Sequence, residues 1–218
     1  MLKFIGSRVL FIFFVCTTAR ADNVHLLLAG GVNFLLPHTE QLRTFIIEPF
    51  APHSADYFPG PLFGLGFAYQ KNHWAIGPNY YFIYNNLDQA RGPDVATTTS
   101  NLTKGYTYSH NLFIDGAFFI TQSHYIKPYL GAGVGFNYVY VNQSLGFPFI
   151  SPLVIRDRAF AFAYNVFIGI SYHLTDFLNL DVKVRYLDSQ PKIHDQFGDI
   201  TGLNYQNIGL FIGLDSKL

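Results

Sequence analysis

The connections between the strand-like stretches of this sequence alternate between long and very short, and this alternation limits the possible folds. Very short connections are expected at Asn72-His73, Ser123-His124 and Thr175-Asp176, and long ones at residues 37–60, 87–104, 143–157 and 188–202. A membrane β-barrel has tight periplasmic turns at one rim and longer external loops at the other. The alternation therefore predicts an all-β chain of eight antiparallel strands that run up and down across a membrane and close into a barrel.

The first 21 residues have the features of a secretory signal peptide. Lys3 and Arg8 precede an apolar run over residues 9–16, and Ala19 and Ala21 form a small-x-small cleavage site. This run is far shorter than the ~20 residues that a membrane-spanning helix needs. We expect cleavage after Ala21, export through the inner membrane, and a single barrel domain over residues 22–218.

The expected mature chain has few charges and no cysteine, because Cys16 lies in the leader. Removal of Lys3, Arg8 and Arg20 lowers the 14 basic residues to 11, against 14 acidic ones. This charge balance lacks the excess of basic residues that is typical of nucleic-acid-binding proteins. Only 13% of all residues are charged, whereas soluble domains have about 25%. Strands that face lipid with every second residue account for the apolar surplus.

Two stretches show the alternation most clearly, residues 158–173 and 178–186. In the second, Leu178, Leu180, Val182, Val184 and Tyr186 alternate with Asn179, Asp181, Lys183 and Arg185. In most strands the less apolar face carries mainly Gly, Ala, Ser and Asn, which are poor at solvating a sheet but small enough for a narrow interior. The lumen of an eight-stranded barrel is just wide enough for side chains to fill it. The pattern thus favours a membrane barrel over a soluble sandwich.

Aromatic residues gather at the strand ends on the apolar face, as in the interfacial girdles of membrane barrels. The predicted loop-side girdle consists of Tyr84, Tyr106, Tyr108, Tyr138, Tyr140, Phe160 and Tyr186, and the partial turn-side girdle of Tyr69, Trp74 and Tyr172.

Five charged residues fall on the luminal face: Asp115, Lys127, Asp181, Lys183 and Arg185. Buried charges must be paired, so one interpretation is a structural network of ion pairs that plugs the barrel. The other is a narrow polar conduit or gate. Among the possible pairs, we expect Asp115 with Lys183.

Known catalytic and binding motifs are absent from the sequence. Gly131, Gly133 and Gly135 have GxGxG spacing within a strand, which indicates small luminal residues rather than a dinucleotide loop. No serine-hydrolase, zinc-protease or Walker motif occurs, nor the H-x-S of lipid A deacylases. The sequence predicts no enzyme, no cofactor and no metal site.

Four histidines, His25, His73, His124 and His173, are expected at the periplasmic rim. They lack a recognised metal-ligand spacing, and a rim ~25 Å across would hold them too far apart for one ion. We interpret them as interfacial residues.

The segment Tyr125-Ile-Lys-Pro-Tyr-Leu-Gly-Ala-Gly-Val-Gly135 resembles the fifth-strand segment of small opacity-like outer-membrane barrels, which are similar to the transmembrane domain of the OmpA family. Members commonly end in an aromatic residue that the assembly machinery reads. Here the expected last strand, residues 207–214, is followed by Asp-Ser-Lys-Leu218, which makes the assembly signal unusual.

The resemblance implies a non-enzymatic protein in the outer membrane of a Gram-negative bacterium. Its external loops would make structural or adhesive contacts with a host or the environment. The implied partners are outer-membrane lipid, lipopolysaccharide and the barrel-assembly machinery. Two alternatives stay open: a narrow channel or carrier of small hydrophobic solutes, and an outer-membrane lipid-modifying enzyme.

Overall fold

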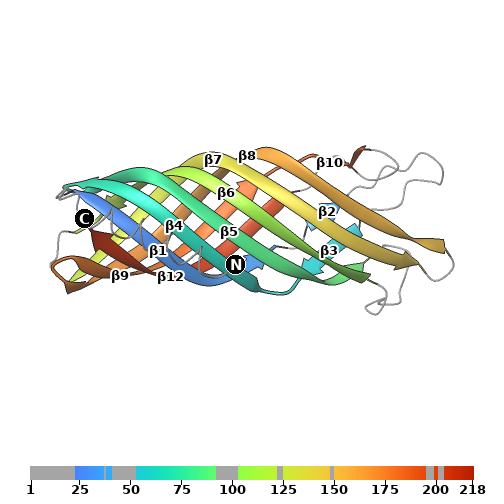
Figure 1. The fold of residues 1–218 in the computed structure, drawn as a ribbon, viewed down its shortest axis with the longest axis horizontal. Helices are drawn as coiled ribbons and strands as arrows, with labels where there is room; N and C mark the ends of the chain where they lie inside the picture. Colours follow the sequence, from blue (N-terminus) through green and yellow to red (C-terminus); the bar gives the residue numbers. More distant parts are fainter. Residues whose placement is uncertain are drawn as a thin grey trace, which may run out of the picture.

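The computed structural model describes residues 23–36, 38–40, 53–91, 103–121, 125–147, 150–194, 199–200 and 204–218. Within these residues, eight strands form a closed barrel: β1 (Val24–Leu35), β4 (Gly60–Lys71), β5 (Trp74–Arg91), β6 (Thr103–Phe119), β7 (Ile126–Phe147), β8 (Ile150–Thr175), β9 (Leu178–Ser189) and β12 (Tyr205–Lys217). Each pairs antiparallel with the next along the barrel, and β12 pairs with β1 to close it (Figure 1). The predicted up-and-down barrel is confirmed. In the part of the chain that the structure describes, no helix is long and apolar enough to cross a membrane.

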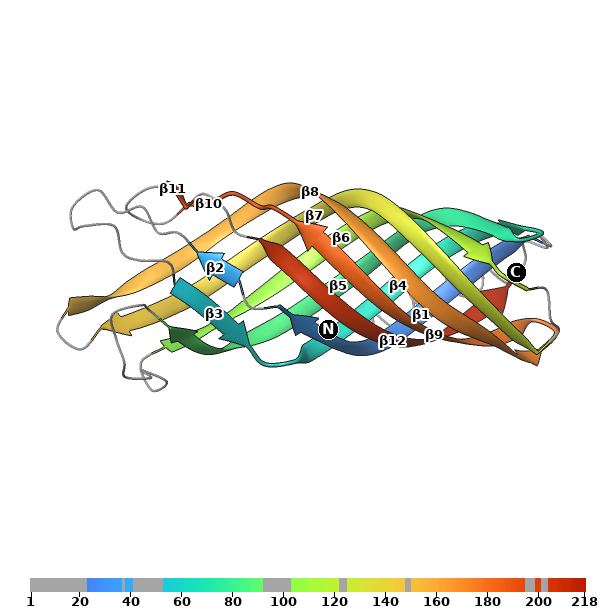
Figure 2. The same cartoon turned by 180° about the vertical axis from the view of Figure 1, so that it is seen from behind.

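The barrel strands have very unequal lengths. β1, β4 and β9 have 12 residues each and β12 has 13, whereas β5, β6, β7 and β8 have 18, 17, 22 and 26. About 9–11 residues suffice to cross a bilayer. The surplus of the long strands projects beyond one rim, which we call the loop side, and Figure 2 shows β7 and β8 reaching furthest.

One predicted loop is in fact a β-hairpin. β7 and β8 remain paired through Leu145↔Leu153 and Phe147↔Ile150, so the expected loop over residues 143–157 is wrong. This part of the ladder lies beyond the short strands of the barrel. Its sequence does not continue the alternation of the barrel wall, and periodicity alone could not detect it.

Two of the other long connections, the first and the last, also contain short strands. In the first, β2 (His38–Glu40) pairs with β3 (His53–Tyr57), and β3 pairs with the loop-side end of β5. In the last, β10 (Ile193–His194) pairs with β11 (Asp199–Ile200). On the loop side, β3 therefore continues along β5 the pairing that β4 makes within the barrel, and β10 and β11 form a separate two-stranded sheet.

At the opposite rim, the turn side, the predicted turns are correct to within a few residues. Asn72-His73 joins β4 to β5, with Asn72 in the left-handed region at φ 53°. A register shift near the end of β8 moves the turn between β8 and β9 from Thr175-Asp176 to Asp176-Phe177.

The short connection between β6 and β7 begins earlier than predicted, because β6 ends at Phe119 rather than at Gln122. Pro128 lacks an N–H for the ladder at this level. Ser123 and His124 lie outside the described residues.

Side chains alternate between lipid-facing and luminal positions as predicted. On β8, Phe160 and Ile168 are 73% and 63% exposed, while Ala163 and Asn165 are 0% and 1% exposed. The outer surface of the barrel is accordingly apolar and the interior is filled.

The C-terminal residues belong to the last strand rather than following it. Asp215 pairs with Leu27 and Lys217 with His25, so the strand expected to end at Leu214 extends to Lys217. The backbone N–H of Leu218 donates to the carbonyl of Val24 at 2.9 Å. The non-aromatic terminus thus helps to close the barrel.

Candidate functional site in the barrel lumen

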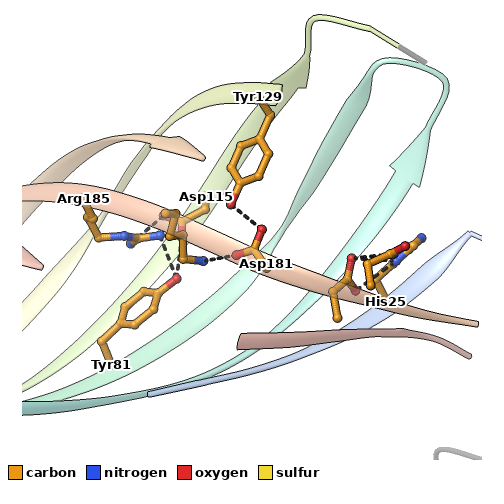
Figure 3. Close-up of polar contacts among 9 residues, drawn as sticks. His25, Tyr81, Asp115, Tyr129, Asp181 and Arg185 are labelled. Carbon is orange, nitrogen blue, oxygen red and sulfur yellow. Dashed lines mark hydrogen bonds and ion pairs between the residues drawn. The ribbon is translucent and has the colours of Figure 1, made fainter. Parts of the chain in front are cut away.

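A buried ion pair crosses the middle of the lumen. Arg185 on β9 contacts Asp115 on β6, with 2.6 Å between Nη2 and Oδ2, and the two residues are 3% and 6% exposed. The same Nη2 donates to the Tyr81 hydroxyl at 2.7 Å, and that hydroxyl donates to Asp115 Oδ2 at 3.1 Å (Figure 3). Asn165 donates to the other carboxylate oxygen at 3.0 Å. Both oxygens of the Asp115 carboxylate therefore accept hydrogen bonds, and the terminal nitrogens of Arg185 are satisfied, while its Nε, buried in the same cross-section, has no partner among the described residues.

The position of Arg185 makes it a brace between opposite walls. β9 and β5 are four strands apart around the eight-stranded barrel, yet Arg185 contacts Tyr81 on β5. The guanidinium carbon lies 4.1 Å from the centroid of the Tyr81 ring and 4.7 Å from that of Phe167. Desolvated cation–π contacts of this kind are favourable and hold the charge in an apolar cross-section.

A second ion pair lies nearer the turn side. Lys183 Nζ is 3.7 Å from Asp181 Oδ2, and the Tyr129 hydroxyl donates to Asp181 Oδ1 at 2.6 Å. Tyr129, on β7, reaches β9 across β8. We refer to Tyr81, Asp115, Tyr129, Asn165, Asp181, Lys183 and Arg185 together as the luminal cluster.

Glycines in the wall make room for this cluster. Gly133 stands between Asp115 and Asn165 in the same row of paired residues, and a Cβ there would lie 2.0 Å from Asp115 Oδ1. Gly169 stands between Tyr129 and Lys183, and its Cβ would lie 2.4 Å from the Tyr129 hydroxyl. The predicted role of the glycine run as small luminal residues thus has a geometric reason.

A cavity of about 90 Å³ lies on the turn side of the luminal cluster. Its lining includes Asp115, Asp181, Lys183, Arg185 and Asp215. A cavity of this size with a charged lining is large enough to hold water, so this half of the lumen has space in which its charges can be hydrated.

The loop-side half of the lumen is packed. Asn33 donates to Asn85 at 3.0 Å and to Asn207 at 2.8 Å, and all three are at most 1% exposed. Around them lies a buried apolar cluster that includes Leu62 and Val139. Amides and apolar side chains fill the section that any solute crossing the barrel would have to pass.

The predicted pair Asp115–Lys183 is wrong, because Asp115 pairs with Arg185 and Lys183 with Asp181. The row of directly paired residues that contains Asp115 meets β9 at Leu187. Toward the turn side, Arg185 is the first luminal position after Leu187 and Lys183 is the second. The stagger of the strands therefore brings Arg185 closer than Lys183 to Asp115. Lys127 is partly buried, and no described hydrogen bond or ion pair joins it to the luminal cluster.

Sequence reasoning assigned no role to Tyr81, Tyr129 or Asn165. Their positions in the alternating pattern are luminal, but nothing local indicates which carboxylate each would contact. The missing information is the strand stagger, which relates residues on different strands.

The ten residues of the predicted girdles have outward-facing side chains. Tyr69, Trp74, Phe160 and Tyr172 are exposed, and Tyr84, Tyr106, Tyr108, Tyr138, Tyr140 and Tyr186 are partly exposed. Several form ring contacts across strands: Tyr108 and Tyr140 stack at 4.9 Å, and Tyr138 contacts Phe160 at 4.9 Å.

The rim histidines whose positions are described each have a different partner. His25 Nδ1 lies 3.0 Å from Asp215 Oδ1, His73 Nδ1 is 2.8 Å from the Phe119 carbonyl, and His173 Nδ1 is 3.1 Å from Asn179 Oδ1. Within the described ranges, no three His, Cys, Asp or Glu residues are grouped so that they could hold a metal ion. The residues of the cleavage site, Ala19 and Ala21, lie outside these ranges.

A closed barrel of eight strands, an apolar outer surface and a filled lumen define this chain as an outer-membrane-type β-barrel. No known protein family matches its sequence, and no curated protein matches it significantly. Solved structures share the fold: Neisserial surface protein A (17% identity, TM-score 0.53, 89% of this chain and 97% of that one) and OprG from Pseudomonas aeruginosa (13% identity, TM-score 0.56, 90% and 98%). A major outer-membrane protein from Thermus thermophilus is also similar, with 9% identity and a TM-score of 0.53 over 88% and 98%.

Proposed function

We propose that this protein is a non-enzymatic, surface-displayed barrel of a Gram-negative outer membrane that presents its loop-side sheet for structural or adhesive contacts. The observation that carries the proposal is the continuation of β5 to β8 beyond the short strands, with β3 added to β5. A protein that served only as a membrane plug would need no more than ~11 residues per strand. The extra pairing builds an ordered surface outside the barrel.

The packed lumen supports a binding role over conduction. Amide and apolar side chains fill its loop-side half, and an eight-stranded lumen leaves little free space. A narrow channel is the second candidate, and the turn-side cavity with its charged lining is what favours it. The charged side chains that line this cavity are also the candidate residues for a lipid-modifying reaction, but they lie in the lumen and do not face lipid.

The decisive experiment shortens the β7–β8 hairpin. Ser144 and Val154 are directly paired, so replacing residues 145–153 by Asn-Gly gives a two-residue hairpin turn. We expect the variant to insert and to keep its heat-modifiable gel mobility. Expressing cells should lose adhesion to epithelial cells and to matrix-coated surfaces. Adhesion equal to wild type would contradict the proposal.

Two further measurements address the alternatives in the unmodified protein. We expect no conductance steps in planar bilayers and unchanged lipid A acyl chains on expression. Regular steps would establish the channel instead, and missing acyl chains would establish the enzyme.

A further inference from the structure

The outer surface of the barrel changes from apolar to basic near the loop-side end of β8. Toward the loop side, Phe162 and Phe160 are followed on the outward face by Arg158 and Arg156, and all four are exposed. On β6 the outward series changes in the same way, from Tyr106 to the exposed Lys104. The apolar band of a membrane barrel ends at an aromatic girdle beside the lipid headgroups. These cations therefore lie at headgroup level.

Tyrosine rings form a continuous surface beside the two arginines. Tyr106 and Tyr108 contact Tyr140 with ring centroids 6.1 and 4.9 Å apart. Tyr140 is directly paired with Arg158 across β7 and β8. We call Tyr106, Tyr108, Tyr140, Arg156 and Arg158 the tyrosine–arginine patch.

The side chain of Arg156 is fixed by a hydrogen bond from Nε, which leaves its two terminal nitrogens free for other contacts. Its Nε donates to the Tyr140 hydroxyl at 2.9 Å, so the two terminal nitrogens can face outward. A guanidinium fork of this kind binds phosphate through two parallel hydrogen bonds. Among the described residues, no acidic side chain forms an ion pair with Arg156 or Arg158. Both arginines are exposed on the outer surface, where an external anion can reach them.

We propose that the tyrosine–arginine patch binds a phosphorylated glycolipid of the outer leaflet, the lipid A part of lipopolysaccharide. Arg156 and Arg158 bind the phosphate, and the tyrosine rings and hydroxyls contact the sugar, while the acyl chains lie against Phe160 and Phe162. A phospholipid also offers a phosphate but has no sugar ring for the flat tyrosine surface. This inference rests on the proposed orientation, with the loop side facing the outside of the cell.

The test is direct binding to the refolded mature chain in detergent, followed by native mass spectrometry. The probes are bisphosphorylated lipid A, dephosphorylated lipid A, phosphatidylglycerol and inorganic phosphate. We expect lipid A to bind about tenfold more tightly than its dephosphorylated form or phosphatidylglycerol. Equal binding of phosphatidylglycerol would overturn the glycolipid assignment. Binding of inorganic phosphate with the affinity of lipid A would reduce the patch to a simple anion site.

Variants separate a built site from general charge attraction. Arg156→Lys with Arg158→Lys keeps both charges but removes the forks, and we expect a loss of about tenfold. Tyr140→Phe removes the hydroxyl that holds Arg156, and we expect about a threefold loss. Lys71→Gln, an exposed cation at the turn side, is the matched control and should bind as wild type. Unchanged affinity in both patch variants would overturn the proposal, and because adhesion is not measured, this failure is distinct from failure of the proposed function.

Discussion

The two halves of the lumen are filled in different ways. The turn-side half holds two ion pairs, buried tyrosines and a cavity. Among the described residues, the loop-side half holds asparagines and apolar side chains. The first tolerates charge because hydrogen bonds compensate it and the cavity beside it has room for water. The second closes the barrel by packing. The difference shows that one narrow lumen can combine bracing with sealing.

The comparison predicts that the largest loss of stability follows removal of the central carboxylate. Asp115→Ala leaves Arg185 buried without its counter-charge, which costs about 3–5 kcal/mol. Urea titration of the barrel in lipid vesicles measures the free energy of unfolding. Asp115→Leu combined with Arg185→Met removes both charges and should recover most of the loss. If the single and double variants are equally unstable, burial of an unpaired charge is not the cause.

A smaller effect is expected from closing the gap in the wall beside that carboxylate. Gly133→Ala places a methyl group against Asp115 and Asn165, and overpacking of this kind costs about 1–3 kcal/mol. Gly116→Ala is the matched control, because its Cβ faces outward and meets only the Ala132 carbonyl oxygen at 3.9 Å. The same titration should show the control within error of wild type. Equal losses would mean that the tight luminal contact is unimportant.

The loop-side half should respond to the loss of a central amide. Asn33→Ala leaves the acceptor oxygens of Asn85 and Asn207 without their shared donor, for about 1–2 kcal/mol. Asn86→Ala, at an exposed position on β5, should have little effect. If Asn33→Ala lowers the free energy of unfolding more than Asp115→Ala does, the loop-side half contributes more to stability than the turn-side half.

The smallest effect is expected at the ion pair that lines the cavity. Lys183→Met removes a cation 3.7 Å from Asp181, but Asp181 keeps its hydrogen bond from Tyr129 and lines a cavity with room for water. We expect a loss of about 1 kcal/mol, measured as a shift of the urea midpoint. A loss as large as that of Asp115→Ala would show that the cavity does not compensate the carboxylate.

Alternation and turn spacing were enough to predict the closed barrel, its eight strands and the sides that Asp115 and Arg185 face. The pairing of Asp115 was not predictable in this way. It depends on how far each strand is shifted against its neighbour, and the pattern within one strand carries no information on that shift. Long side chains add to the difficulty, because Arg185 reaches a residue on a strand that is not its neighbour.

The hairpin of residues 143–157 was missed for another reason. A strand in the membrane must place apolar side chains toward lipid and small or polar side chains toward the lumen. Its sequence therefore alternates with a period of two. Beyond the short strands that requirement ends, while backbone pairing continues. Residues 215–217 were missed at the other rim in the same way, since Ser216, the next outward position after Leu214, does not continue the apolar face of β12.

The unequal strands also affect the entropy of recognition. Residues 150–162 of β8 have no partner on β9, and with strands tilted by about 40° they raise the hairpin tip roughly 30 Å along the barrel axis. A flexible loop of this reach would lose much conformational freedom when a partner bound it. Here that freedom is already lost when the ladder forms, so a partner meets a surface ordered in advance.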